Sequence, residues 1–228
     1  MISVVLAAYK GEKYISEQVK SILSQLGDND ELIISDDFPQ GKTRDAIKDI
    51  ISTDTRVIYI HGKGQGLIKN FENAVNNSKG DYIFLSDQDD VWLDGKVAAV
   101  MNEFENGADV VMHDAFITDA HLNPTGERAF VLNSARVGTI KNIMKNSYQG
   151  SCMAFRKEMK KYILPFPNSI PMHDQWIGLM GERHGKVHLI NHPYILYRRH
   201  SENVSGNSSS LLQKIKWRLG IIGCLLRK

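Results

Sequence analysis

Three aspartates within four residues are the feature of this sequence with the clearest chemistry. Asp87, Asp89 and Asp90 follow an apolar run at residues 82–85 that has the character of a buried β-strand. The acids are therefore expected just beyond the carboxyl end of a strand, the edge at which open α/β sheets bind ligands. Carboxylates packed this closely repel one another unless a hard cation such as Mg²⁺ or Mn²⁺ offsets their charge. Because such ions bind carboxylates together with substrate phosphates, the pattern predicts a phosphate-bearing substrate, although an isolated Asp-x-Asp is more simply a solvated acidic turn.

A second acidic pair, Asp36 and Asp37, follows another apolar run at residues 31–35. The carboxyl ends of parallel strands lie on one edge of a sheet, so both acidic groups are expected to face one crevice. There a carboxylate can accept a hydrogen bond from a nucleotide base or a ribose hydroxyl. A helix N-cap is the equally plain alternative for this pair.

Asp174 lies between His173 and Gln175 and two residues before Trp176. A partly desolvated carboxylate in such surroundings has a raised pKa and suits general-base work. The alternative is a helix N-terminus, with Asp174 as the cap and Trp176 in the core.

Residues 197–206 contain His200, a candidate metal ligand, and two arginines suited to a diphosphate, Arg198 and Arg199. A surface histidine in a polar loop is the alternative. The glycines at 62, 64 and 66 lack both the Rossmann and the P-loop spacing, so they are interpreted as turn glycines.

The elements that position these residues alternate between strands and helices. Near-continuous apolar runs predict strands at 2–8, 31–35, 56–60 and 81–86, helical periodicity predicts helices at 15–26, 43–51 and 68–77, and further strands are expected at 109–113, 152–155 and 187–190. Short connections between alternating elements predict an α/β fold with a mostly parallel, doubly wound sheet. The polar stretch 119–150 is expected to form an excursion or lid.

The chain has 228 residues and a formal net charge of +2, which suits one α/β domain and gives no global field for nucleic acid. Two distant cysteines provide no disulfide framework and fit a reducing cytoplasm. The opening apolar run is too short for a signal peptide, and no stretch is long enough for a transmembrane helix.

Charge and apolar residues are unevenly distributed at the end of the sequence. Residues 211–228 carry five basic residues and no acid, with Leu211, Ile215, Leu219, Ile222 and Leu226 at helical spacing. A basic amphipathic helix is typical of an interfacial membrane element. A helix packed on the domain, or one that mediates dimerisation, is the alternative. We therefore expect a main domain at 1–206 and an amphipathic tail at 207–228.

Together these motifs resemble glycosyltransferase family 2, whose members have the GT-A fold, and most of all its bacterial branch that builds O-antigen, capsule and rhamnose-containing polysaccharides. The similarity covers roughly residues 2–206. It is carried by five motifs in the family's order: the segment 8–15, the Ser-Asp-Asp at 35–37, the segment 81–92 (DYIFLSDQDDVW), the His-Asp-Gln-Trp at 173–176, and the segment 197–206.

The resemblance implies a role for each matching residue. Asp174 would be the base that deprotonates the acceptor hydroxyl, and Asp89, with His200, would bind the divalent cation, Mn²⁺ or Mg²⁺. The nucleotide would be bound by Ala8, Tyr9, Asp36, Asp37, Asp87 and Gln88. The donor and acceptor sugars would lie near Asp90, Trp92, Gly150, His173, Trp176 and Arg198.

The implied function is an inverting transfer from a UDP- or dTDP-linked sugar to a hydroxyl of a lipid-linked glycan, at the inner face of the cytoplasmic membrane. Two departures, Lys10 in place of the family's Asn and Phe38-Pro39-Gln40 after the acidic pair, bear on which base is preferred. A sugar-phosphate nucleotidyltransferase and a non-catalytic sugar-nucleotide-binding scaffold are the alternatives.

Overall fold

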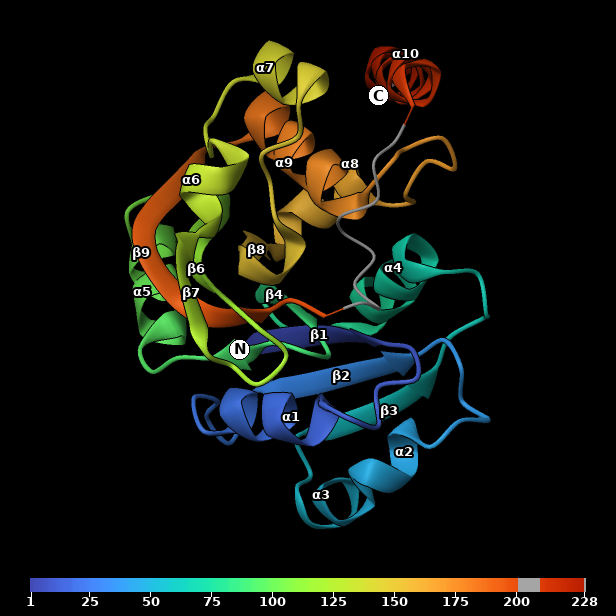
Figure 1. Ribbon diagram of the computed structural model, residues 1–228, viewed down its shortest axis with the longest axis vertical. Coiled ribbons are helices and arrows are strands. Elements are labelled where there is room, and N and C mark those ends of the chain that lie inside the picture. The colour runs from blue at the N-terminus through green and yellow to red at the C-terminus, as the bar shows by residue number, and fades with distance from the viewer. Residues whose placement is uncertain (201–209, 228) are drawn as a thin grey trace.

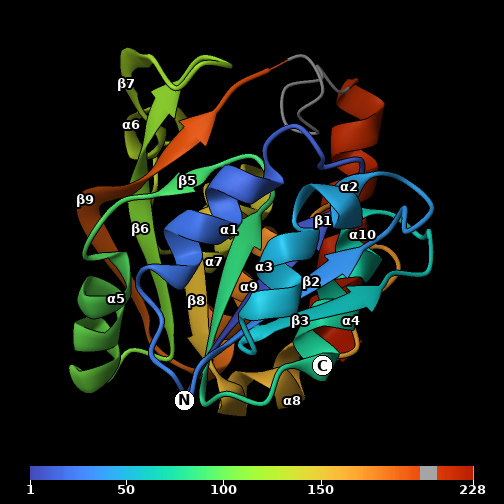
Figure 2. The same cartoon turned by 90° about the horizontal axis from the view of Figure 1, so that it is seen from below.

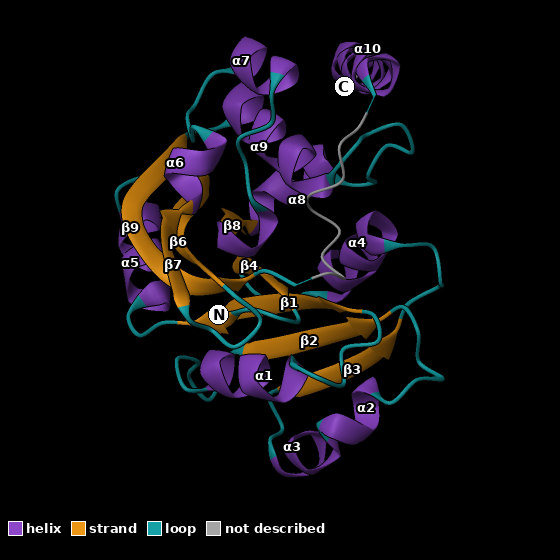
Figure 3. Cartoon of the chain, viewed as in Figure 1, coloured by secondary structure: helices purple, strands orange, loops and turns teal. Residues whose placement is uncertain are grey.

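The computed structural model describes residues 1–200 and 210–227. One nine-stranded sheet runs through the molecule in the order β3-β2-β1-β4-β8-β6-β9-β5, with β7 paired to β6. Helices cover both of its faces (Figures 1 and 3). The α/β fold expected from the sequence is confirmed.

The first half of the sheet is parallel. It contains β1 (Ile2–Ala8), β2 (Glu31–Asp36), β3 (Val57–His61) and β4 (Tyr82–Asp87), and every residue of β1 and β2 is buried. Strands buried on both faces need apolar residues at successive positions, which is why these segments lack a polar–apolar alternation. The register pairs Ala8 with Asp36 and Ala7 with Asp87, so these strand ends lie together.

Helices on opposite faces of this parallel half hold it in place. Figure 1 shows α1 (Ile15–Leu23) and α3 (Lys48–Thr53) on one face and α4 (Leu67–Asn77) on the other. The helix expected at 43–51 is instead two short helices, α2 (Thr43–Ala46) and α3, because Ile47 leaves helical geometry at φ −128° and ψ 16° while its side chain is buried.

Beyond β4 the sheet is mixed. β8 (Met153–Arg156) is antiparallel to both β4 and β6 (Val110–Thr118), whereas β9 (Val187–Arg198) runs parallel to β6. The edge strand β5 (Val91–Trp92) pairs antiparallel with β9, and α5 (Lys96–Glu105) follows it. Figure 2 shows β6 and β9 side by side, away from the β1-β2-β3 half.

The stretch 119–150, expected to form an excursion or lid, contains β7 (Pro124–Arg128), α6 (Ala129–Asn133) and α7 (Thr139–Met144). Two 3₁₀ turns, Gly150–Cys152 and Lys157–Met159, and the short helix α8 (Lys160–Ile163) lead to α9 (His173–His184). Because α9 begins at His173, the Asp174 motif lies in the first turn of a helix.

The amphipathic helix expected at the end of the sequence is α10 (Leu211–Arg227). It packs on the domain through Ile221, Cys224 and Leu225, which are buried. The boundary expected at residue 206, and residues 201–206 of the fifth motif, lie outside the described residues. In the described part of the chain, no helix combines the length and apolar character needed to cross a membrane.

Candidate active site

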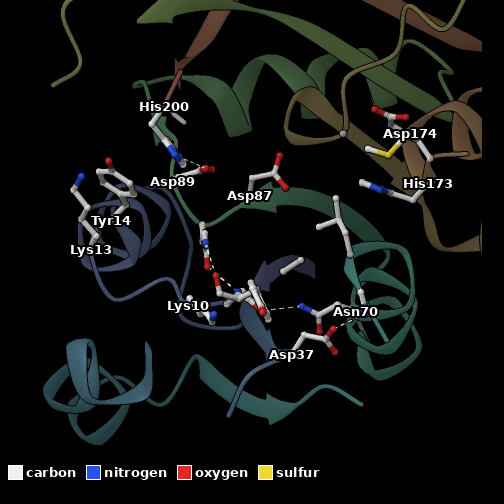
Figure 4. A pocket seen from close by; sticks show the side chains of 18 of the residues that line it. Lys10, Lys13, Tyr14, Asp37, Asn70, Asp87, Asp89, His173, Asp174 and His200 are labelled. Carbon is white, nitrogen blue, oxygen red and sulfur yellow. Dashed lines mark hydrogen bonds and ion pairs between the residues drawn. The ribbon is translucent and has the colours of Figure 1, made fainter. Parts of the chain in front are cut away.

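A cavity of about 840 Å³ opens at the carboxyl ends of β1 and β4 (Figure 4). Ten of the residues singled out in the sequence line it: Ala8, Tyr9, Asp37, Asp87, Gln88, Asp89, Gly150, His173, Asp174 and His200. Members of both acidic groups, Asp37 from one and Asp87 and Asp89 from the other, thus face one crevice. Lys10 and Lys13 also line the cavity and place positive charge near its acids.

Asp37 organises the glycine turn on one side of the cavity. Its Oδ1 accepts a hydrogen bond from the Gly64 amide at 2.8 Å, and its Oδ2 accepts one from the Gly66 amide at 2.7 Å. Both glycines have positive φ, at 66° and 87°, which favours residues without a Cβ. The interpretation as turn glycines therefore misses a contact: the turn is fixed to the carboxylate expected to meet the nucleotide base.

The loops that follow β1 and β4 are joined by one side-chain amide. Gln88 accepts a hydrogen bond from the Tyr9 amide at 2.8 Å and donates one to the Tyr9 carbonyl at 3.0 Å. Asn70, on α4, donates to the carbonyls of Ala8 and Ser35 at 3.0 and 2.8 Å. Asn70 lines the cavity but has no motif around it, so sequence reasoning did not find it.

The acidic cluster faces the middle of the cavity, and Figure 4 shows Asp87 between Asp89 on one side and Asp174 on the other. The Nε2 atom of His200 lies 2.8 Å from Oδ2 of Asp89. Burial, together with the charges of Asp89 and Asp174, raises the pKa of Asp87 to about 7.

The donor set fits a divalent cation that is only partly enclosed by protein. Among the described residues, no three His, Cys, Asp or Glu side chains are grouped as a complete metal site. Asp89 and His200 nevertheless supply an oxygen and a nitrogen at hydrogen-bond distance, and Asp87 lies beside them under repulsion that a cation would relieve. Mg²⁺ is commonly bound by one or two carboxylates and completed by phosphate oxygens and water, and Mn²⁺ shares its oxygen ligands.

Asp174 stands across the cavity at the start of α9. Its Oδ1 accepts hydrogen bonds from the Asn146 side chain at 3.0 Å and from the Gln175 amide. Burial raises the pKa of Asp174 to about 6, and these hydrogen bonds to the charged form oppose the shift. A carboxylate with this pKa is ionised near neutral pH and can still take up a proton, as a general base must.

His173 lies beside the candidate base with its ring turned toward the cavity (Figure 4). The ring stacks on Phe71 at a centroid distance of 4.0 Å, and burial lowers its pKa to about 3, so it is neutral. Neither ring nitrogen has a hydrogen-bond partner among the described residues. A Cβ on Gly150 would lie 2.6 Å from Nε2 of His173, so glycine keeps this approach open.

Five residues expected at the site lie behind the cavity lining: Asp36, Asp90, Trp92, Trp176 and Arg198. Trp176 is fully buried and its indole donates to the Ile163 carbonyl at 2.9 Å. Asp36 accepts hydrogen bonds from the Tyr59 hydroxyl and the Phe38 amide. These contacts fix the position of the elements that surround the cavity.

Arg198 connects the acidic cluster to α1. Its Nε donates to the Asp89 carbonyl at 2.7 Å, its Nη2 pairs with Glu17 at 2.6 Å, and its amide donates to Asp90 at 3.2 Å. The Arg198 side chain is only 4% exposed. Its hydrogen bonds to Asp89 and Asp90 therefore serve to position the turn that carries these two acids.

Lys96 is a buried amine that sequence reasoning missed. Its Nζ donates to the Ser151 carbonyl at 2.9 Å and lies 3.8 Å from the centroid of the Trp92 ring. Burial lowers the pKa of Lys96 to about 7, whereas the nearby Asp90 and Asp87 act in the opposite direction. A lysine four residues after a tryptophan gives no signal of burial by itself.

Comparison with known proteins identifies the family. The model of glycosyl transferase family 2 matches residues 3–164, most of the chain. The chain belongs to this family. It is 27% identical over 235 residues to the dTDP-rhamnosyl transferase RfbG of Shigella flexneri, an alignment that covers 95% of this chain and 78% of RfbG.

A shorter similarity and a solved structure add to this. The Escherichia coli UDP-Glc:alpha-D-GlcNAc-diphosphoundecaprenol beta-1,3-glucosyltransferase WfaP is 37% identical over 101 residues, which are 43% of this chain and 39% of WfaP. The structure of S. aureus TarS 1-349 in complex with UDP-GlcNAc superimposes with a TM-score of 0.74 at 16% identity, covering 98% of this chain and 66% of that one. The fold of this glycosyltransferase is therefore GT-A.

Proposed function

We propose that this family 2 enzyme is an inverting, metal-dependent transferase that moves a sugar from a UDP- or dTDP-linked donor to an acceptor hydroxyl during bacterial surface-polysaccharide synthesis. One observation carries the proposal: the Asp89–His200 pair and Asp174 face the same cavity from opposite sides (Figure 4). With a nucleoside diphosphate bound at one side and the general base Asp174 at the other, the donor sugar would lie between them.

The nucleotide occupies the part of the cavity formed by the ends of β1, β2 and β4. The nucleotide base lies between Asp37, which is hydrogen-bonded to the glycine turn, and Tyr9, which is hydrogen-bonded to Gln88; Ala8 also lines this part of the cavity. Asp87 lies toward the ribose. The names of RfbG and WfaP, which carry dTDP and UDP donors, support one of these two nucleotides for this chain.

Asp89 and His200 would hold the divalent cation, and Asp87 lies nearby. When bound, the cation offsets the negative charge that develops on the departing nucleoside diphosphate. Two protein ligands would be enough for an ion of this kind, which usually takes phosphate oxygens and water as its other ligands.

Asp174 accepts the proton of the acceptor hydroxyl as that oxygen bonds to the anomeric carbon and the bond to the diphosphate breaks. Attack from the face opposite the leaving group inverts the anomeric centre. His173, neutral and with both ring nitrogens unpartnered among the described residues, can exchange hydrogen bonds with a sugar hydroxyl in this region.

The acceptor is a glycan on a lipid carrier, and the enzyme works as a peripheral protein at the inner face of the cytoplasmic membrane. Two observations support this part. The WfaP name specifies a diphosphoundecaprenol-linked acceptor, and α10 presents exposed leucines and isoleucines with basic residues beside them.

The test is release of nucleoside diphosphate from UDP-, dTDP- and GDP-sugars with and without Mn²⁺. We expect metal-dependent release from one donor and its loss in Asp89→Ala. Asp94→Ala removes an exposed aspartate five residues further along and is the matched control. Asp174→Asn should abolish transfer to an acceptor while sparing slow donor hydrolysis, which needs no acceptor base.

The alternatives predict different products. Release of pyrophosphate from a nucleoside triphosphate and a sugar phosphate would indicate a nucleotidyltransferase. Metal-dependent nucleotide binding without turnover of any donor would indicate a binding scaffold, and absence of both binding and turnover would overturn the transferase proposal.

A further inference from the structure

The outward side of α10 is an apolar stripe. Leu212, Ile215, Leu219, Ile222 and Leu226 recur at alternating spacings of three and four residues, and their side chains are between 38% and 82% exposed. At 100° per residue these five fall on one side of the helix, opposite the face that Ile221, Cys224 and Leu225 bury. A contiguous exposed apolar stripe of this kind indicates a binding surface.

Helix α7 extends this stripe. The Arg218 side chain donates to the Met144 carbonyl from Nε at 3.1 Å and from Nη2 at 2.7 Å, so α7 abuts α10. On the helical wheel Arg218 lies between the buried face of α10 and the apolar stripe, which places α7 on the side of the stripe. Ile140 and Met144, one turn apart on α7, are 80% and 53% exposed.

The two helices lie at the same end of the molecule (Figure 1). We use the name α7–α10 surface for the exposed apolar residues of the two helices together with Val137, two residues before α7: Val137, Ile140, Met144, Leu212, Ile215, Leu219, Ile222 and Leu226.

The exposed charged residues of α7, α10 and the residues beside α7 in the sequence are all basic. No acidic residue occurs between positions 129 and 157 or in α10. The exposed basic residues around it are Lys141, Lys145, Lys214, Lys216 and Arg227. Exposed apolar side chains that share these two helices with exposed cations match the chemistry of an anionic lipid bilayer, which takes the apolar residues below its headgroups and the cations among them.

A second copy of the chain is a poorer match, although the spacing of the stripe also suits a helix pair. The positions that flank the stripe along such a pair carry Lys216 and Arg218, and α10 has no acid to oppose them. Two copies would therefore bring like charges together.

The inner side of the same segment holds the candidate base. The Asn142 carbonyl accepts a hydrogen bond from the Gln175 side chain at 2.6 Å, and Asn146, two residues after α7, donates to Asp174 at 3.0 Å. The α7–α10 surface is thus the exterior of the wall that carries Asp174.

We propose that the α7–α10 surface binds an anionic phospholipid bilayer and sets the acceptor side of the cavity beside it. The naming of an acceptor side rests on the proposed function, in which Asp174 faces the acceptor. The lipid contact itself requires no catalysis.

The test is flotation of the full chain with vesicles of phosphatidylcholine alone or with phosphatidylglycerol added. We expect binding to the anionic vesicles and weakening as NaCl rises from about 0.05 M to about 0.5 M. Ile140→Gln/Met144→Gln and Leu212→Gln/Leu219→Gln should each reduce partitioning about tenfold or more, since each removes exposed apolar area from the contact. Val131→Gln, an exposed apolar residue on α6, is the matched control and should bind as the unaltered chain does.

Each contrary result has a definite meaning. Unchanged partitioning of Ile140→Gln/Met144→Gln would overturn the two-helix surface, as would equal binding of the unaltered chain to uncharged vesicles. A lipid-independent dimer that Leu212→Gln/Leu219→Gln dissolves would assign the stripe to a second copy. Nucleoside diphosphate release without vesicles should be unchanged in both double variants, so failure of this proposal and failure of the proposed function are distinguishable.

Discussion

The side-chain amide of Asn146 donates to Oδ1 of Asp174 at 3.0 Å, linking the loop after α7 to the first turn of α9. Asp174 is buried, and burial alone would favour its neutral form. The hydrogen bond from Asn146 favours the charged form and counts among the contacts that keep the pKa at about 6. Together with the Gln175 amide, Asn146 therefore favours the ionised form of the candidate base and also holds it in position.

Replacing Asn146 with Ala should raise the pKa of Asp174, because a donor to the carboxylate is lost. Transfer to an acceptor requires the ionised base, so its rate rises with pH through the pKa of Asp174 and then levels off. We expect the acidic limb to move upward by roughly one pH unit, the shift that loss of one charged hydrogen bond produces. The measurement is the pH profile of transfer at saturating donor, with Asn77→Ala on the far end of α4 as the control. An unmoved acidic limb would remove Asn146 from this role.

Asp37 and the glycine turn give a prediction for nucleotide binding. Asp37→Ala leaves the Gly64 and Gly66 amides without their acceptors and frees the turn that bounds the base. We expect UDP or dTDP affinity to fall by about 1–3 kcal/mol, as for loss of hydrogen bonds to a charged acceptor. Isothermal titration calorimetry measures this, with Asp45→Ala, an exposed acid on α2, as the control. Equal affinities in the two variants would separate Asp37 from the nucleotide.

The parallel half of the sheet could be predicted from the sequence because its strands are buried on both faces. That burial leaves continuous apolar runs, and the acids that end strands 31–36 and 82–87 then had to share an edge. The mixed half of the sheet was harder to predict from the sequence. β7, α6 and α7 lie in a polar stretch without periodicity, and their formation depends on contacts with β6 and α9, such as Glu182 bonding Thr139 and Asn142.

The site residues also divide into those that the sequence could predict and those that only the tertiary structure reveals. Carboxylates and histidines in short motifs could be singled out because their chemistry is recognisable at any position. Asn70, Asn146 and Lys96 could not, since nothing local distinguishes them from solvated side chains and only the tertiary structure buries or pairs them. Trp92 and Trp176 show the converse, because a tryptophan beside a catalytic motif can serve as core instead of sugar platform.

Gly178 in α9 tests the packing behind the base. A Cβ at this position would lie 2.2 Å from the Tyr148 ring, which is held by a hydrogen bond from its hydroxyl to Glu182 at 2.6 Å. Gly178→Ala should therefore destabilise the fold by about 1–3 kcal/mol through overpacking. Urea unfolding measures the change. Gly223→Ala in α10, where nothing lies within 4 Å of an added Cβ, is the matched control and should stabilise by up to about 1 kcal/mol. Equal stability of the two variants would show that the Tyr148 ring moves aside without lowering the free energy of unfolding.

Lys96 makes the stability of the protein depend on pH in a definite direction. Burial lowers the pKa of Lys96 from its ordinary value of 10.5 to about 7, so between these values the unfolded chain binds a proton that the folded protein does not. The free energy of unfolding contributed by this group must then rise with pH across that window, by up to a few kcal/mol, and become constant below it.

Lys96→Met replaces the apolar part of the side chain with one of similar length and removes the titrating group. The difference in unfolding free energy between the unaltered chain and Lys96→Met should therefore increase from about pH 8 to about pH 10, because only the former gains stability there. Urea unfolding at several pH values measures this, and Lys79→Met, a surface lysine, should show no such slope. If the difference stayed flat, Lys96 would keep its proton in the folded state. The Ser151 carbonyl and the Trp92 ring, which contact its amine, would then outweigh the cost of burying the charge.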